Sequence, residues 1–386
     1  MRYLIVGLVL LAIVLPTSYW GFSRNNALTR LQDAGAEVQV SNADAWYGAL
    51  LWRPTAFSLG KATPSDALLA DMDTIAVAPT ELDLSGYPIT DAGIEKLTGC
   101  GVLQSLNLTK TSISDEALEV LADCEGLQML VLDDTAVTDE GLEALSELTT
   151  LTSLSLARTG ITDAGMAAAS QWQSLKHLDL SGTQLKGGFF EQATQQCKLE
   201  SLALNESSIE ANALSSLVVC AQLQRLSLVK SKLSSAAVNG LAKLRQVKHL
   251  DASGSDLTGS GMRRLLAGAP LEHLLVADTQ AGQGLGDVPL SAPALVELDL
   301  SRTGLTDATA PALRGLRSLK ILNLDGNNLT DATTLVLLGL TGLESVRITN
   351  TKMPVAAAHR LYKTLPKGII YYGNAGSVGW LGYRRD

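Results

Sequence analysis

Histidine, cysteine and aromatic residues are scarce in this chain, and no catalytic signature accompanies the few that occur. The 386 residues include four His, four Cys and 4% aromatics. Four His leave little material for acid–base catalysis. The sequence has no Gly-x-Ser-x-Gly, His-Glu-x-x-His, Walker or dinucleotide-binding motif, and no Cys-x-x-Cys spacing typical of a metal site. We therefore expect no catalytic residues, no cofactor and no metal centre.

Blocks of positive charge are also absent. The chain has 30 Lys and Arg against 39 Asp and Glu, a net charge of -9, and the two signs are interleaved. Proteins that bind nucleic acid concentrate Lys and Arg on one surface to neutralise phosphates. A nucleic-acid partner is therefore not expected.

What the chain does have is a Leu-x-Leu signature that recurs with an uninterrupted 24-residue period. The first apolar positions of the twelve signatures are Leu82, Leu106, Leu130, Leu154, Leu178, Leu202, Leu226, Leu250, Leu274, Leu298, Leu322 and Val346. A fixed period of this length is typical of a solenoid, in which each repeat contacts its neighbours. The pattern predicts one elongated repeat body rather than several globular domains.

Each repeat has the pattern of a short strand, a turn and a short helix. In one example, Leu106 and Leu108 point inward from the strand, and Ser114-Asp115 begins a helix that buries Leu118 and Leu121. A hydroxyl or carboxylate at that position can accept hydrogen bonds from the free amides of the first helical turn. Between strand and helix, a polar turn column follows the same period: Thr111, Thr135, Thr159, Thr183, Ser207, Ser231, Ser255, Thr279, Thr303, Asn327 and Thr351. We expect these side chains to bond backbone groups of the turns that strand and helix leave unpaired.

The four Cys fall at or beside one repeat column. Cys100, Cys124 and Cys220 share that column, and Cys197 lies one residue past it in the repeat before Cys220. Neighbouring strands lie about 4.8 Å apart, within disulfide range, so the pairs Cys100–Cys124 and Cys197–Cys220 are compatible with disulfides in an exported protein. Leu and Trp fill the same column elsewhere, and buried thiols are the interpretation we favour.

The N-terminus has the character of a membrane segment. After Arg2, positions 3–22 carry no charge. A helix crosses a bilayer core in about 20 apolar residues, so this stretch is long enough to span one. Aromatic residues at both ends suit the two interfaces. We favour an uncleaved anchor with the repeat body exported to the periplasm or cell surface; the alternative is secretion after cleavage of a signal peptide.

The consensus Leu-x-x-Leu-x-Leu-x-x-Thr-x-Ile-Thr-Asp-x-Gly-Leu-x-x-Leu resembles the leucine-rich-repeat family, most closely at Leu151–Ala169 and Pro79–Leu97. Its Ile-Thr-Asp-x-Gly-Leu segment is similar to the cysteine-containing subclass of F-box proteins, with Thr or Ser in place of that subclass's strand-end Cys. The anchor resembles membrane-anchored bacterial members. The resemblance implies an α/β solenoid curved like a horseshoe, with parallel strands on the concave face and short helices on the convex face.

These patterns divide the chain into four parts. They are an anchor at 1–24, an N-terminal cap region at 25–78, the leucine-rich-repeat solenoid of about 12 repeats at 79–366, and a cap strand with a flexible tail at 367–386. Curved solenoids bind through the concave strand face. The candidate binding residues on that face are Arg158, Arg225, His249, Asp251, His273, Asp299, Asn323 and Arg347.

We expect a non-enzymatic, membrane-anchored scaffold that binds a protein or polymer partner. No Trp or Tyr occupies the strand-face columns of the repeats, which predicts weak to moderate affinity. Three alternatives stay open: an enzyme with a site in residues 25–78 or at His249, Asp251 and His273; an envelope protein that assembles side by side; and a ligase adaptor, which the absence of an F-box-like module disfavours. The oligomeric state is left open. A metal or proton-sensing role for the two neighbouring His is a further alternative to a plain solvated strand face.

Overall fold

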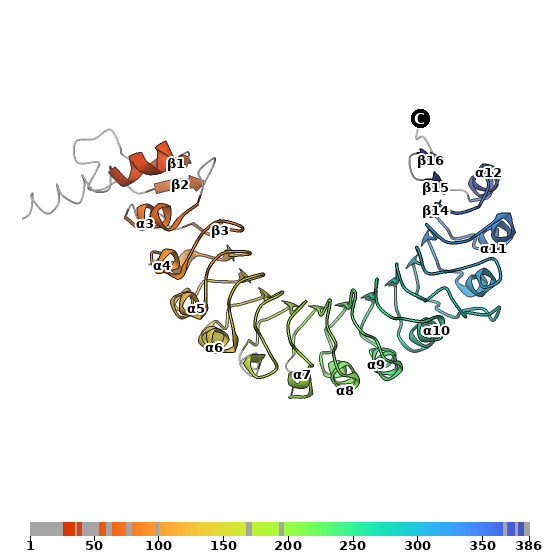
Figure 1. Ribbon diagram of the computed structural model, residues 1–386, viewed down its shortest axis with the longest axis horizontal. Helices are drawn as coiled ribbons and strands as arrows, with labels where there is room; N and C mark the ends of the chain where they lie inside the picture. The colour runs from red at the N-terminus through yellow and green to blue at the C-terminus, as the bar shows by residue number, and fades with distance from the viewer. Residues whose placement is uncertain are drawn as a thin grey trace, which may run out of the picture. The chain divides into compact units, whose positions relative to one another are not determined.

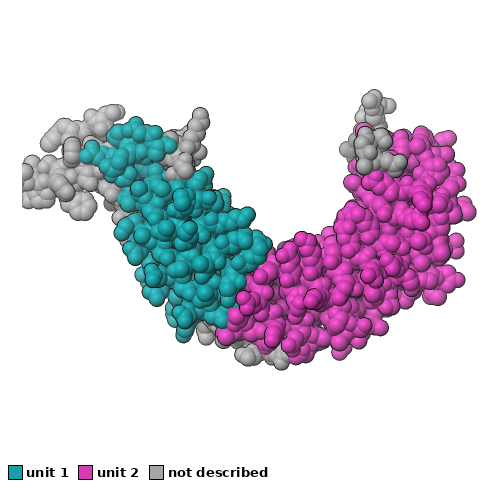
Figure 2. Space-filling model, viewed as in Figure 1, with its two compact units in different colours: residues 1–161 teal, residues 162–386 magenta. Residues whose placement is uncertain are grey.

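The computed structural model describes residues 26–34, 37–40, 54–58, 64–74, 79–97, 100–166, 172–192, 197–365, 369–374 and 377–381. The chain forms two compact units, residues 1–161 and 162–386 (Figure 2). Within each unit the strands lie along one side and the helices along the opposite side (Figure 1).

Unit 1 begins with helical residues 26–33 and an antiparallel pair of strands, β1 (Glu37–Val40) and β2 (Pro54–Ser58). Repeating strands and helices follow: α3 (Asp66–Thr74), β3 (Glu81–Asp83), α4 (Asp91–Ile94), η1 (Cys100–Val102), β4 (Ser105–Asn107), α5 (Asp115–Leu121), β5 (Met129–Val131), α6 (Asp139–Ala144), η2 (Leu145–Glu147) and β6 (Ser153–Ser155). Strands β3 to β6 are parallel, and each residue pairs with its equivalent in the next repeat, as Leu82 pairs with Leu106.

Unit 2 continues the same pattern, and its parallel strands belong to the same 14-stranded sheet as β3 to β6. Its elements are β7 (His177–Asp179), α7 (Gly188–Gln192), β8 (Ser201–Ala203), α8 (Ala211–Ser216), η4 (Leu217–Val219), β9 (Arg225–Ser227), α9 (Ser235–Leu241), β10 (His249–Asp251), α10 (Gly259–Gly268), β11 (His273–Leu275), β12 (Glu297–Asp299), η5 (Ala310–Gly315), β13 (Ile321–Asn323), η6 (Asp331–Thr333), α11 (Thr334–Leu338), β14 (Ser345–Thr349), α12 (Val355–Thr364), β15 (Ile369–Asn374) and β16 (Ser377–Leu381). Strand β16 reverses direction and pairs antiparallel with β15. It lies within residues 367–386, where the sequence predicted a cap strand and a flexible tail.

The core of each unit consists of the apolar side chains that the 24-residue pattern predicts to be internal. Leu106, Leu108 and Ile113 are fully buried between strand and helix, and Leu118 and Leu121 of α5 are buried against them. Because the 24-residue period aligns equivalent apolar residues of neighbouring repeats, these repeats share one continuous core. The predicted division of a repeat into strand, turn and helix is confirmed.

The polar turn column has the structural role that the sequence indicates. Most of the Thr and Ser hydroxyls donate to the backbone carbonyl three residues earlier, as Thr135 does to Leu132 at 2.6 Å and Thr279 to Val276 at 2.6 Å. The hydroxyl of Ser231 instead donates to the carbonyl of Leu204 in the preceding repeat, at 2.8 Å. The side chains are largely buried, and Thr303 is 0% exposed. A buried carbonyl left without a donor is costly, so these hydroxyls stabilise the turn that leaves each strand.

A second set of hydrogen bonds links one repeat to the next. The carboxylate of Asp115, at the start of α5, accepts from the backbone N–H of Thr138 at 2.8 Å and from its hydroxyl at 2.6 Å. Asp91 and Ser114 are bonded in the same way, as are Asp307 and Thr330. The sequence predicted that these Ser/Thr-Asp pairs cap their own helices. Some hydroxyls do so, but the carboxylates reach into the following repeat; we call this series the Asp ladder.

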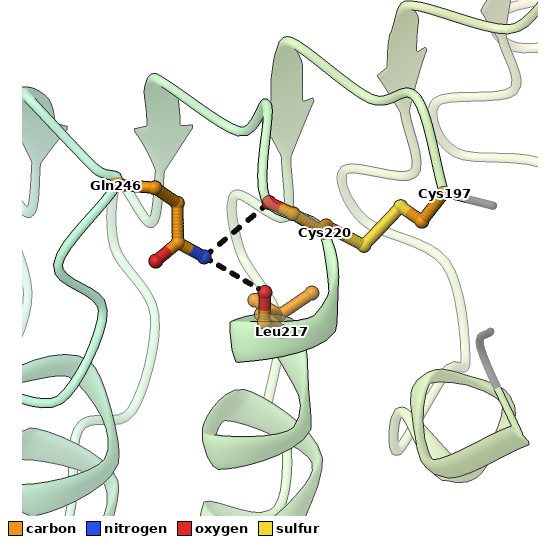
Figure 3. Close-up of a disulfide and its surroundings, with 4 residues drawn as sticks. All are labelled: Cys197, Leu217, Cys220 and Gln246. Atoms are coloured by element: carbon orange, nitrogen blue, oxygen red, sulfur yellow. Dashed lines mark hydrogen bonds between the residues drawn. A yellow bond between two sulfur atoms is a disulfide. The ribbon is translucent and has the colours of Figure 1, made fainter. Parts of the chain in front are cut away.

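Two disulfides correct the interpretation of the Cys column as buried thiols. Cys197 and Cys220 are joined, with their Cα atoms 4.9 Å apart (Figure 3). Beside them, Nε2 of Gln246 donates to the carbonyls of Leu217 at 2.9 Å and Cys220 at 3.3 Å. Cys124 is also disulfide-bonded, whereas the side chain of Cys100, its predicted partner, lies outside the described residues. Adjacent repeats place the paired Cys within disulfide distance, so the thiols form a covalent bond and do not remain small buried apolar side chains.

The membrane segment stays a prediction, because residues 1–24 lie outside the described part of the chain. In the part that is described, no helix is both long and apolar enough to cross a bilayer.

Candidate binding surface

The strand face of unit 2 is the set of side chains that point away from the core on either side of each buried central residue. On β10, for example, Leu250 is buried, whereas His249 and Asp251 are half-buried on the outer side. The parallel register aligns equivalent positions in columns: His249 lies between Arg225 and His273, and Asp251 between Ser227 and Leu275. Side chains from non-adjacent parts of the sequence are thereby brought into one surface.

Seven of the eight predicted binding residues lie on this strand face of unit 2: Arg225, His249, Asp251, His273, Asp299, Asn323 and Arg347. The eighth, Arg158, belongs to unit 1 and sits in the turn after β6. Its guanidinium forms a two-point ion pair with Asp134, at 2.6 and 2.7 Å. That contact holds the pKa of the Asp134 carboxyl below its usual value.

Three of the predicted residues support their own turns. The carboxylates of Asp251 and Asp299 and the side-chain oxygen of Asn323 each accept from the backbone N–H two residues later, at 2.8–3.0 Å. Nδ2 of Asn323 also donates to Asp299 at 2.9 Å. A side chain that bonds its own backbone in this way fixes the turn after the strand. These three residues therefore stabilise the turns beside the strand face and also add polar groups to its surface.

The two histidines form a compact cluster with neighbouring acids. The rings of His249 and His273 stack with centroids 4.1 Å apart and planes 8° from parallel. Nδ1 of His273 lies 2.8 Å from a carboxylate oxygen of Glu297, and Glu272 pairs with Lys248 at 2.9 Å. The pKa of His249 is lowered, first by burial and then by the neighbouring His273 ring. Asp251, which the sequence grouped with the two His, turns instead to the backbone of Ser253.

Charged residues along both edges of the strand face are paired with each other. On the edge where the strands begin, Lys–Glu pairs recur at every third repeat: Lys176–Glu200, Lys248–Glu272 and Lys320–Glu344. On the turn edge the pairs Glu206–Lys230 and Asp278–Arg302 show the same spacing. These turn residues have φ of 53–57°. Because each pair is close to neutral, neither edge carries a field of one sign.

The end of the strand face differs from the rest because it is apolar and aromatic. Ile321 is 40% exposed, Ile369 37% and Trp380 61%. Trp380 of β16 pairs in register with Tyr371 of β15, and Tyr371 with Arg347 of β14. The Arg347 guanidinium lies 5.2 Å from the centre of the Tyr371 ring and is held by Asp325 at 2.9 Å. We call these five residues, Ile321, Arg347, Ile369, Tyr371 and Trp380, the C-terminal surface.

Strand β16 places Trp380 on this surface because of the antiparallel pairing. Gly379 lies opposite Tyr372 on β15, and a Cβ built at Gly379 would lie 2.8 Å from the Tyr372 ring. That ring therefore covers one side of β16 at Gly379. The next residue, Trp380, points to the opposite side, which is the side of Tyr371 and of the strand face. The strand-face columns of the twelve repeats contain no Trp or Tyr, and the exposed aromatic side chain comes from the strand that follows β15.

A family model and one solved structure agree with this architecture. Residues 100–122, 147–168 and 315–332 match the model of the Leucine Rich repeat family. The solved structure of an internalin from Listeria monocytogenes superposes with a TM-score of 0.50 at 20% identity, covering 79% of this chain and 88% of that one. This chain has a leucine-rich-repeat fold. A second solved structure, the APL1 leucine-rich-repeat domain, gives a TM-score of 0.46 at 17% identity over 78% of this chain and 73% of that one. No curated protein sequence matches the chain.

Within the leucine-rich-repeat fold, two parts of the candidate surface were not found from the sequence. Glu272 precedes its strand by one position, so a reading limited to the two outward strand positions omits it. Trp380 lies beyond the last repeat, in a Gly-rich segment without the 24-residue pattern. The sequence does carry a signal for Glu272: at the position before the strand, Lys in one repeat is followed by Glu in the next at Lys176 and Glu200, Lys248 and Glu272, and Lys320 and Glu344.

Proposed function

We propose that this chain is a non-enzymatic leucine-rich-repeat scaffold that binds a protein partner through the strand face of unit 2. The C-terminal surface is the energetic centre of that interaction. The observation that carries the proposal is the group formed by the exposed Trp380 and Arg347 and the half-buried Tyr371 in adjacent strands. Trp, Tyr and Arg are the residue types that most often dominate binding energy at protein interfaces.

The surroundings of this group favour a protein interface. Ile321 and Ile369 add exposed aliphatic surface beside the aromatic residues. Interface centres are depleted in unpaired charge and enriched in aromatic residues and Arg. The Arg347 charge is already compensated by Asp325, so the partner gains ring and guanidinium contacts without needing to supply a matching carboxylate.

The proposal includes attachment to a membrane with the repeat body exported, as in membrane-anchored bacterial leucine-rich-repeat proteins. It is supported by the uncharged residues 3–22 after Arg2. The Cys197–Cys220 disulfide also supports it, because disulfides persist in oxidising compartments outside the cytosol. Digestion of intact cells or spheroplasts with a protease tests the topology. Cleavage of the repeat body in intact preparations supports export, and full protection until the membrane is permeabilised contradicts it.

Binding is tested with the full chain in mild detergent, crosslinked to envelope proteins and compared with two single variants. Trp380→Ala removes the central ring, and we expect at least about a 10-fold loss of the crosslinked partner, as for an interface hot spot. Tyr87→Ala is the matched control, because Tyr87 is an exposed aromatic residue of unit 1, remote in sequence from the C-terminal surface.

The pattern of partner loss among the variants shows whether the C-terminal surface is the binding interface. Loss with Trp380→Ala, retention with Tyr87→Ala and recovery with Trp380→Phe would support the proposal. Equal recovery of the same partner by all variants would place the interface elsewhere. Crosslinks only between copies of this chain would favour the side-by-side assembly instead.

A further inference from the structure

Three potential metal ligands converge on the strand face outside the C-terminal surface. One nitrogen each from His249 and His273 and one carboxylate oxygen from Glu272 all lie within 4.8 Å of one another. All three side chains are half-buried. The group belongs wholly to unit 2 and sits on β10, on β11 and at the residue directly before β11.

The repeat register explains why these side chains meet. His249 and His273 occupy the same position in consecutive repeats and are direct partners in the parallel ladder. Their rings stack face to face at 4.1 Å. The stack brings one nitrogen of each ring within reach of a single ion, and the imidazole nitrogen is the commonest metal ligand among side chains.

The acid on the next strand orients one of the ligands. Glu297 lies opposite His273 in the ladder and contacts its Nδ1 at 2.8 Å. With the Nδ1 proton donated to this carboxylate, Nε2 of His273 carries the lone pair. A carboxylate bonded to the far nitrogen of a histidine is a recurrent second layer of metal sites, where it fixes the ring and raises its basicity.

We propose that His249, His273 and Glu272 form a binding site for a divalent transition-metal ion of the Zn²⁺ type, with Glu297 as a positioning residue. Two imidazoles and one carboxylate are a donor set that Zn²⁺ uses in proteins. Bond lengths of about 2.0–2.2 Å place tetrahedral ligand atoms about 3.4 Å apart. Atoms now within 4.8 Å of one another reach that separation by side-chain rotation, which the half-exposed positions allow.

Two positively charged side chains beside the three ligands weaken the binding of a metal ion. Lys248 is paired with Glu272 at 2.9 Å and must release it. Exposed ion pairs of this kind are weak, so a coordinated metal displaces the lysine. Arg225, the ladder neighbour of His249 on the other side, adds repulsion that limits affinity. Three protein ligands leave a fourth position open for water or for a donor from outside the chain.

The site is tested on the full chain in mild detergent, freed of metal with a chelator and titrated with Zn²⁺ against a chromogenic competitor. We expect one ion per chain. His249→Ala and His273→Ala, and independently Glu272→Gln, should each weaken binding by at least about 10-fold, and Glu297→Gln by about 10-fold or more. Lys248→Gln should tighten binding, because it removes the competitor for Glu272. The far-UV circular dichroism of each variant verifies that the solenoid is intact.

The chain provides a matched control. His177 occupies the same strand column on β7, three strands from β10, and His177→Ala should leave Zn²⁺ binding unchanged. The absence of stoichiometric binding, or equal weakening by His177→Ala, would overturn the proposal. Binding that survives in both His249→Ala and Glu272→Gln would also overturn it. None of these results depends on a protein partner, so the metal site can fail while the proposed scaffold function stands, and the reverse.

Discussion

Within the polar turn column, Asn327 forms the largest number of the described hydrogen bonds to backbone groups, and replacing it should destabilise unit 2 strongly. The side chain is 3% exposed. Its oxygen accepts from the backbone N–H of Thr303 at 3.1 Å and of Leu305 at 3.0 Å. Its amide nitrogen donates to the carbonyls of Leu300 at 2.7 Å and Leu324 at 3.0 Å. One amide thus completes the turns of two adjacent repeats.

The expected magnitude for Asn327→Leu follows from counting the groups left unpaired. The Leu300 carbonyl keeps the Thr303 hydroxyl at 2.7 Å, whereas Thr303 N–H, Leu305 N–H and the Leu324 carbonyl lose their side-chain partner. Each buried group without a partner costs about 1–3 kcal/mol. Burial of the larger apolar surface of Leu offsets about 2 kcal/mol. Three unpaired groups cost about 3–9 kcal/mol together, so we expect the free energy of unfolding to fall by about 1–7 kcal/mol, with a central value of about 4 kcal/mol.

Asn327→Thr is the informative comparison, because it restores the residue type of the other turns. Its hydroxyl can donate to the Leu324 carbonyl as Thr303 does to Leu300, and the Leu305 N–H can bond the Thr303 hydroxyl, as the Ala281 N–H bonds that of Thr279 at 3.1 Å. Only the Thr303 N–H then stays unpaired, so we expect a loss of about 1–3 kcal/mol. The neighbouring Asn328 is exposed, and Asn328→Ala should change stability by less than about 0.5 kcal/mol. Urea unfolding followed by circular dichroism, with hydrogen exchange of the flanking amides to detect local opening, measures all three variants. The argument is refuted if Asn327→Leu lies within about 1 kcal/mol of the wild type, or if Asn327→Thr is equally damaging.

Two further predictions concern covalent and electrostatic links within unit 2. Replacing both Cys197 and Cys220 by Ser should lower the free energy of unfolding by about 3 kcal/mol, the chain-entropy value for a loop of this length; the wild type should lose at least as much in reductant, which also opens the disulfide of Cys124, and an unchanged urea midpoint would contradict this. Burial would raise the pKa of Asp307, but hydrogen bonds from Thr330 and Thr333 outweigh it and hold that pKa below its usual value. The charged form is therefore favoured by folding, and its contribution is present above the unfolded pKa of about 3.9 and lost as pH falls through the folded value. The stability advantage of the wild type over Asp307→Asn should accordingly shrink between pH 5 and pH 3 (about one unit either side of the unfolded pKa), with Asp287→Asn as an exposed control; a gap that is constant with pH would show that the charge of Asp307 does not matter.

The sequence predicts this fold well because its strongest pattern is local. Leu106 and Leu108 specify an inward strand face, and Ser114-Asp115 specifies a helix start, without reference to any distant residue. The structure confirms the strand Ser105–Asn107 and the helix Asp115–Leu121. Contacts between repeats were harder to predict. The carboxylate of Asp115 could satisfy its own helix or the next repeat, and only the packed structure shows that it bonds Thr138.

The sequence predicts only those residues of the candidate surface whose position follows from the 24-residue period. The columns of outward positions on β9 to β14 follow from the period, so Arg225, His249 and Arg347 were placed on the strand face. Trp380 was not, because its position depends on a reversal of the chain after β15 that no repeat pattern encodes. The pairing of Glu272 with the two His likewise depends on side-chain direction at a strand edge.

The Asp ladder also gives the solenoid a direction. Each carboxylate belongs to one repeat and each hydroxyl and amide donor to the next, so the two ends of a severed stack are chemically unlike. A cut that removes preceding repeats exposes a turn whose donors have lost their acceptor, while a cut that removes following repeats leaves a carboxylate that water solvates readily. At the start of unit 1 the acceptor comes from α3, where Asp66 takes the N–H of Thr90 at 3.0 Å and its hydroxyl at 2.6 Å. Shortening the protein by whole repeats should therefore be tolerated better from its C-terminal side than by deletion of the helix that carries Asp66.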